Sequence, residues 1–98
     1  MLQADSCVCT AVLYELWKEQ NGKCAVTGES MTYVRGQGSV PTNLSIDRID
    51  NNVGYTRDNI RLVCYQVNFM KRALTDEGLA IWCEKIISGL RSNQSENC

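Results

Sequence analysis

The segment from Ser45 to Lys71 carries the residues whose types and spacing suggest chemistry. Two carboxylates, Asp47 and Asp50, come before a turn, and a helix after it brings in an amide, Asn68, close to basic residues. Carboxylate and amide oxygens suit hard cations, and basic side chains suit phosphate. No other stretch combines these groups, so we expect the functional site here.

Local patterns predict two short strands and a helix in this segment. Leu44 to Asp50 is typical of a strand and ends in Asn51-Asn52, a pair that favours turns. Ile60 to Val63 is β-branched or aliphatic, which predicts a second strand leading into a helix that begins near Cys64.

That helix has two faces. Its apolar residues, beginning with Val67, fall at helical spacing, and Asn68 shares the opposite face with Lys71 and Arg72. A strand that carries carboxylates is thereby brought opposite an amide and two cations.

Two motifs resemble the small phage-type HNH endonuclease family. Cys24 to Gly28 reads CAVTG, and Ser45 to Lys71 reads SIDRIDNNVGYTRDNIRLVCYQVNFMK. The match runs from about residue 23 to residue 71, and its pieces occur in the family's order. The resemblance implies an α+β fold, in which a ββα-metal finger (also called a His-Me finger) over about residues 44–72 is flanked by N-terminal and C-terminal amphipathic helices.

The resemblance also implies a role for each site position. Asp47 and Asn68 would hold one divalent cation, Mg²⁺ or a similar hard ion, and Asn59 would brace the loop between the strands. Arg48 stands where the family carries its catalytic histidine. The chain contains no histidine at all, so the catalytic positions implied are Arg48 and Asn59.

Arg48 cannot perform the histidine's task. The family's histidine takes a proton from the attacking water, whereas a guanidinium stays protonated and offers only donors. Arg48 can instead clamp a phosphate through two hydrogen bonds. Cleavage would then need hydroxide on the metal, or Asp50 or Tyr55 as the base. Because strand side chains alternate between faces, Asp47 and Arg48 serve one site only if the strand bends.

Charge is distributed unevenly along the chain. Residues 23–72 include seven basic and four acidic side chains, a net charge of +3, whereas the rest of the chain carries −4. A basic finger between acidic helices suits a small patch that faces phosphate, with salt-sensitive binding. The residues predicted to contact nucleic acid, DNA above all, are Arg48, Arg57, Arg61, Lys71 and Arg72. The alternative is that the arginines of this patch are merely solvated.

Length and composition predict a single domain over residues 1–98. Hydrophobic residues make up 44% and charged residues 21% of the chain, as is usual in a globular protein. Met1 to Cys9 carries an acidic residue and no basic start, so no signal peptide is predicted, and no apolar run approaches membrane length. We therefore expect a cytoplasmic protein that has no membrane partner.

The six cysteines are expected to be free thiols, because the cytosol is reducing. Many members of the HNH family hold a structural zinc on two CxxC pairs. The corresponding positions here read Cys24 with Thr27 and Cys64 with Val67, so half of each pair is missing. A structural zinc is not expected, and Cys24 and Cys64 are predicted to pack in the core.

Amphipathic patterns predict a helix on each side of the finger. The first spans Asp5 to Gln20, is capped by Asp5 or Ser6, packs on the core and stops at Asn21-Gly22. Between this helix and the finger we expect short strands at residues 23–28 and 30–34 and a loop at residues 35–43.

The second helix begins after Thr75, a suitable cap, and its apolar residues recur every three or four positions. They are Leu79, Trp82, Cys83, Ile86, Ile87 and Leu90. We expect this stripe to cover the first helix and the finger within the chain, the alternative being a dimer seam. Ser92 to Cys98 is polar and is predicted to be a disordered tail.

Three functions fit these patterns. The first is an HNH-like metal-dependent endonuclease that hydrolyses phosphodiester bonds in DNA. The second is a catalytically lapsed finger that still binds nucleic acid, for which the missing histidine argues. The third is a protein-binding module, such as an inhibitor made by a phage or mobile element, which the net charge of −1 permits.

Overall fold

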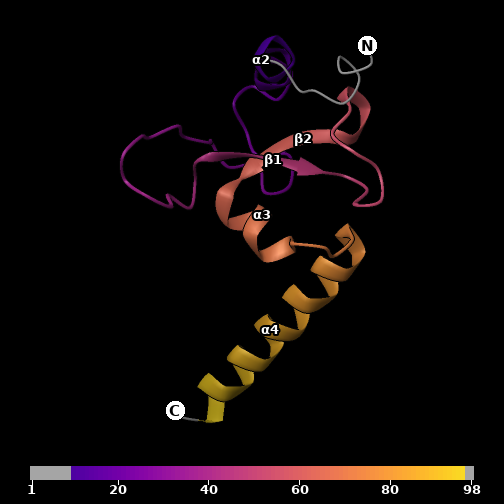
Figure 1. The fold of residues 1–98 in the computed structure, drawn as a ribbon. Helices are drawn as coiled ribbons and strands as arrows, with labels where there is room; N and C mark the ends of the chain where they lie inside the picture. Colours follow the sequence, from indigo (N-terminus) through magenta and orange to yellow (C-terminus); the bar gives the residue numbers. More distant parts are fainter. Residues whose placement is uncertain (1–9, 97–98) are drawn as a thin grey trace.

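The computed structural model describes residues 10–96, and it shows a small α+β protein with a two-stranded antiparallel sheet (Figure 1). The elements, in chain order, are helix α2 (Thr10–Glu19), strand β1 (Leu44–Arg48), the 3-10 turn η1 (Arg57–Asn59), strand β2 (Ile60–Cys64), helix α3 (Tyr65–Lys71) and helix α4 (Asp76–Glu96). The α+β class predicted from the sequence is confirmed.

The sheet forms where the sequence predicted it. β1 pairs with β2 in a register that sets Ile46 opposite Leu62 and Asp47 opposite Arg61. β1 ends at Arg48, two residues before the predicted end at Asp50. α3 follows β2 without a break and packs against both strands, so a strand–loop–strand–helix unit lies at the centre of the molecule.

The apolar core gathers on β2. Four of its five residues are buried, which is why the run reads as continuously apolar apart from Arg61. α2 covers this strand with Leu16, and Val12, Leu13 and Trp17 pack around the buried cluster. The buried apolar residues are Leu16, Cys24, Met31, Ile60, Leu62, Val63 and Cys64.

The end of α2 depends on two residues with left-handed backbone. Asn21 has φ of 58° and Gly22 has φ of 67°, as the predicted stop requires. A Cβ on Gly22 would also lie 2.9 Å from the ring of Trp17, so glycine is needed there for space as well as for its backbone freedom. The predicted cap of this helix, Asp5 or Ser6, lies outside the described residues.

The segments between α2 and β1 hold less regular structure than the sequence predicted. Instead of strands at residues 23–28 and 30–34, the described chain has only isolated bridges, Lys23 with Ser30 and Thr32 with Asn43. The Asn43 side chain satisfies backbone groups of Val34 at 2.8 and 2.9 Å. Hydrogen bonds from a side chain thereby replace a strand ladder where the ends of the 35–43 loop meet.

The C-terminal helix forms as predicted but does not pack as predicted. Thr75 caps it, because the backbone N–H of Gly78 donates to Thr75 Oγ1 at 3.0 Å. Beyond its first turns α4 projects away from the sheet (Figure 1). Trp82, Ile86 and Leu90 on this part of the helix are exposed. The expected intrachain packing is therefore wrong for most of this stripe, and only Leu79 and Cys83 are partly buried. The helix also runs to Glu96, through most of the predicted disordered tail.

The projecting helix makes the molecule elongated. The radius of gyration is 16.1 Å, against about 13 Å expected for a compact chain of this length. In the part of the chain that the structure describes, no helix combines the length and the apolar character that crossing a membrane requires.

Candidate functional site

Asp47 stands at the centre of a buried group of charges. Its side chain is 3% exposed, and that of Lys71 is fully buried. Lys71 Nζ donates to Asp47 Oδ1 at 3.1 Å and Oδ2 at 3.0 Å, and to the backbone oxygen of Arg48 at 2.9 Å. The three protons of the ammonium are thereby matched to three acceptors on one strand end, which is the condition for burying a charge.

Arg61 extends this group to α4. Its Nε donates to Asp47 Oδ2 at 2.8 Å, and its two terminal nitrogens donate to the carboxylate of Asp76 at 2.7 and 3.1 Å. Such a two-point contact restricts both position and angle. One arginine on β2 therefore joins the strand that carries Asp47 to the first turn of the last helix.

The pKa values of Arg61 and Asp76 follow from this geometry. Burial by itself would lower the pKa of Arg61, but the hydrogen bonds to Asp76 and Asp47 outweigh it, and the pKa is raised. The same hydrogen bonds from Arg61 hold the pKa of Asp76 below its ordinary value of 3.8. Both groups are charged at neutral pH.

Asn68 faces β1, the strand on which the sequence predicted its partner. Its Nδ2 donates to Ser45 Oγ at 2.7 Å and to the backbone oxygen of Ile46 at 3.2 Å. The amide thus holds α3 on the strand, one residue before Asp47. Both predicted metal positions therefore lie where β1 meets α3, although each is already engaged with neighbouring protein groups.

These side chains do not fit a divalent cation in the arrangement observed. Both oxygens of Asp47 accept hydrogen bonds from cations, and a metal ion there would meet the ammonium of Lys71. Within residues 10–96, no group of three or more His, Cys, Asp or Glu side chains could hold a metal ion. The ammonium of Lys71 binds the carboxylate of Asp47, which the resemblance assigned to the metal ion.

Asn59 ties the loop between the strands. Its Nδ2 lies 3.0 Å from the backbone oxygens of Asp50, Val53 and Gly54, and its Oδ1 accepts from the backbone N–H of Asp50 at 2.9 Å. One buried amide therefore satisfies four backbone groups of a loop that has no ladder of its own.

Arg48 points to a different surface from Asp47, as strand alternation requires. Its guanidinium lies 5.1 Å from the centre of the Tyr55 ring. Together with Asn51, Arg72 and Ala73 it lines a hollow of about 490 Å³. The strand does not bend enough to bring Arg48 and Asp47 into one site.

The five residues predicted to contact nucleic acid divide into two groups. Lys71 and Arg61 are held by Asp47 and Asp76, and Lys71 has no access to solvent. Arg57 pairs with Glu19 at 2.8 Å on the neighbouring α2. The prediction that Lys71 contacts nucleic acid is therefore wrong, because its buried side chain lies on the apolar side of α3. Arg48 and Arg72 have no carboxylate partner among the described residues.

Cys24 and Cys64 are buried free thiols beside one another in the core. The backbone N–H groups of Thr27 and Cys64 donate to Cys24 Sγ at 3.4 and 3.3 Å. Burial raises the pKa of Cys64. For Cys24, burial also opposes the thiolate, but the hydrogen bonds from Thr27 and its neighbours outweigh it, and the pKa is lowered.

No family model, no curated protein and no solved structure matches this chain. The likeness to HNH endonucleases therefore stays a prediction from the sequence.

The sequence analysis placed one site residue on the wrong face and missed another. Lys71 was placed on the polar face of α3, although it lies four residues after the apolar Val67 and so on the same side of the helix. Asp76 was not singled out at all. Its position in the first turn of α4, where a carboxylate is favoured, is the only local signal for it.

Removing Lys71 should destabilise the protein strongly. We expect Lys71→Met to lower the free energy of unfolding by about 3 to 5 kcal/mol, because Asp47 is left buried with one cation fewer. The neighbouring exposed Arg72→Met should change it by no more than about 0.5 kcal/mol. Urea unfolding measures both. In the double variant Asp47→Asn/Lys71→Met the loss should be smaller than the sum of the single losses, and strict additivity would contradict a direct pair.

The loop should depend on Asn59. Asn59→Ala removes four hydrogen bonds to backbone groups, and we expect a loss of about 2 to 4 kcal/mol in the free energy of unfolding. Asn52→Ala, in the same loop but with an exposed side chain, should cost no more than about 0.5 kcal/mol. Equal losses of unfolding free energy for the two variants would show that the hydrogen bonds of Asn59 do not hold the loop.

The Arg61–Asp76 contact should make part of the stability acid-sensitive. Because the folded pKa of Asp76 lies below 3.8, its contribution is fully present above that pH and is lost as the pH falls through the folded pKa. Wild type should therefore exceed Asp76→Asn in stability at neutral pH, and the difference should shrink as the pH falls below 3.8. A difference that does not depend on pH, measured by urea unfolding, would contradict the ion pair.

Proposed function

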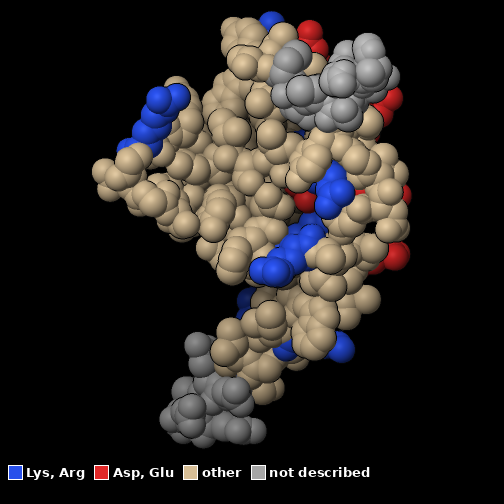
Figure 2. Space-filling model, in the orientation of Figure 1, with Lys and Arg blue, Asp and Glu red and all other residues tan. Residues whose placement is uncertain are grey.

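We propose that this chain binds the sugar-phosphate backbone of nucleic acid through Arg48 and Arg72. The observation that carries the proposal is that these two arginines, from the end of β1 and the end of α3, line one hollow and have no carboxylate partner in the described chain. In Figure 2 basic side chains gather on this face, where β1 and α3 end. The other arginines of the finger are paired internally.

The hollow suits a phosphate group. Two guanidinium groups offer planar sets of donors that match phosphate oxygens. The Tyr55 ring beside Arg48 stabilises that cation through its π face and limits the positions it takes. Asn51 adds an amide at the edge of the same hollow.

The backbone of Arg72 supports a role beyond packing. Arg72 has φ of 47° and ψ of −114°, a conformation that costs a residue with a Cβ about 1 to 3 kcal/mol. Glycine would hold this helix end without strain. Strained positions of this kind cluster at binding sites, and here the strained residue supplies half of the cation pair.

Binding without cleavage fits the neighbouring charges best. The proposed finger has its acidic position neutralised by Lys71 and Arg61, and the position expected for its base holds an arginine. Metal-dependent cleavage is the second candidate, favoured by the strand–loop–strand–helix order and by Asn68 on β1. It requires that a metal ion displace Lys71 from Asp47.

Loss of either arginine should weaken binding and its dependence on salt. For a labelled DNA duplex, we expect Arg48→Ala and Arg72→Ala each to lower affinity about tenfold at low salt, because each removes charge-assisted hydrogen bonds. The slope of log affinity against log salt should fall by about 0.9 for each phosphate that the variant no longer neutralises. Arg57→Ala, an arginine already paired with Glu19, is the matched control and should change little.

Arg72→Gly separates binding from folding. It should raise the free energy of unfolding by relieving the strained backbone, and it should still bind DNA as weakly as Arg72→Ala. Fluorescence anisotropy and urea unfolding on the same samples measure both quantities. Undetectable binding by wild type at low salt, or equal losses for Arg57→Ala, would contradict the proposal and favour a protein partner.

Cleavage is tested on plasmid DNA with Mg²⁺ or Mn²⁺. We expect none from wild type, and none from Arg48→His, because a new base does not release the carboxylate of Asp47 from its two cations. Cleavage that Asp47→Asn abolishes would replace the binding proposal with the nuclease.

A further inference from the structure

Helix α4 carries an apolar seam that the described chain covers only in part, at Leu79 and Cys83. Leu79, Cys83, Ile86 and Leu90 follow one another at spacings of four, three and four residues, the pattern by which one helix packs along another. Ile86 is 49% exposed and Leu90 is 58% exposed. Exposing so many large apolar side chains on one surface indicates an interface.

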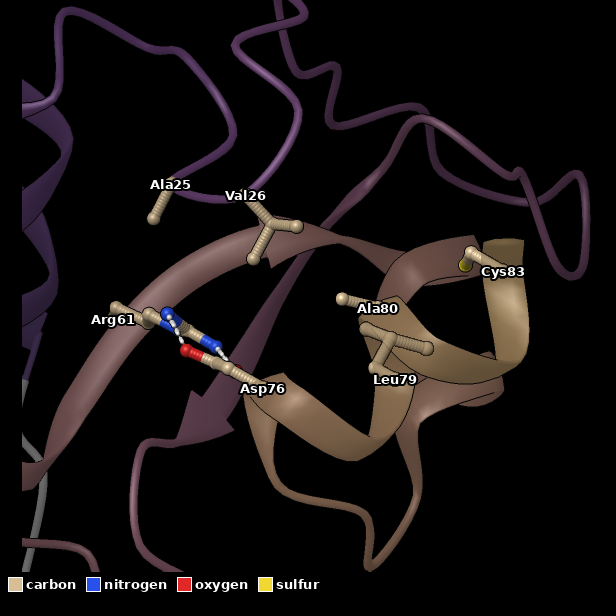
Figure 3. Close-up of a pocket in the computed structure, with 7 residues that line it drawn as sticks. All are labelled: Ala25, Val26, Arg61, Asp76, Leu79, Ala80 and Cys83. Atoms are coloured by element: carbon tan, nitrogen blue, oxygen red, sulfur yellow. Dashed lines mark hydrogen bonds and ion pairs between the residues drawn. The ribbon is translucent and has the colours of Figure 1, made fainter. Parts of the chain in front are cut away.

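The first turns of α4 form one wall of a groove. The opposite wall is the loop that carries Ala25 and Val26, and the groove encloses about 340 Å³ (Figure 3). Leu79, Ala80 and Cys83 line it from α4, and the Arg61–Asp76 ion pair lies at its edge. An apolar floor with a charged rim is the usual anatomy of a protein interface.

We propose that the seam and the groove bind a second copy of this chain, with the two α4 helices antiparallel. A two-fold axis between residues 84 and 85 sets Leu79 opposite the partner's Leu90, and Cys83 opposite the partner's Ile86. The same patch then serves both copies, as a closed dimer requires. This inference is independent of the proposed nucleic-acid function.

The residues beside the seam favour the antiparallel arrangement. Across antiparallel helices Trp82 packs on the partner's Gly89 and Ile87 packs on the partner's Ala80, so a large side chain meets a small one at each place. Parallel helices would set Trp82 against the partner's Ile87, so two large side chains would compete for the same space. A Cβ on Gly89 would have no neighbour within 4 Å in its own chain, so the space at Gly89 is free for the partner.

The groove and the charges agree with this arrangement. At the level of Leu79 and Ala80, the partner's Leu90 and Ile87 enter the groove beside Val26. The acidic start of α4, with Glu77 in its first turn, lies within one residue of the partner's Arg91 and on the same flank. A parallel pair would place the acidic starts together.

Gly89→Leu tests the proposal with the full chain. The substitution leaves the monomer intact, because the position is open and leucine favours a helix, but it fills the space that Trp82 of the partner subunit needs. By sedimentation equilibrium we expect a dimer for wild type and a dissociation constant raised about tenfold or more for Gly89→Leu. Ser88→Leu, the same change one residue away on the outer face, should leave it within about twofold.

Circular dichroism is the control for folding, and we expect each variant to keep its helix content. Leu90→Asp should also abolish the dimer, because it places a charge opposite the partner's Leu79. A wild type that stays monomeric from micromolar to millimolar concentration overturns the proposal. So does a dimer that Ser88→Leu weakens as much as Gly89→Leu, since the interface would then lie elsewhere or pair the helices differently.

Discussion

The buried contact between Lys71 and Asp47 is the constraint on which the rest of the structure depends. A fully buried ammonium is tolerated only when acceptors surround it, and here both carboxylate oxygens and a backbone oxygen of β1 do so. This contact holds α3 against the end of β1. Through Arg61, which shares the carboxylate, the same group of charges reaches the first turn of α4. A domain with few buried apolar residues thus has its elements joined by charge as well as by packing.

The same contact limits what the molecule can do. Asp47 is fully engaged, so the positive charge in the hollow at this end of the molecule comes from Arg48 and Arg72. In the proposed function this end of the molecule binds phosphodiesters, and Arg48 stands at the position to which the resemblance assigns the general base. Binding a phosphate backbone asks only for cations held in place, and the Tyr55 ring and the strained helix end provide that.

Sequence patterns predicted most of the local structure, apart from the strands expected at residues 23–28 and 30–34, and predicted the tertiary contacts poorly. Apolar runs and turn residues placed both strands, the Thr75 cap and the helix over residues 76–90, because those features arise from neighbours along the chain. The pairing of Arg57 with Glu19 joins residues far apart in sequence, and no local pattern reveals it. Lys71 was misplaced because a lysine is assumed to face water. The apolar face of α4 was assigned to intrachain packing, because its apolar period is the same whether the same chain or a second chain covers it.

Because the cation beside Asp47 is the ammonium of Lys71, this contact does not depend on the supply of a metal ion. A finger closed by a metal ion must be loaded after synthesis, and its stability follows the concentration of that ion and the strength of competing chelators. Lys71 is part of the polypeptide, so its contact with Asp47 forms at a fixed one-to-one ratio and at an effective concentration set by the chain alone. Folding of this contact needs no delivery system, and a scarcity of divalent ions leaves it unaffected.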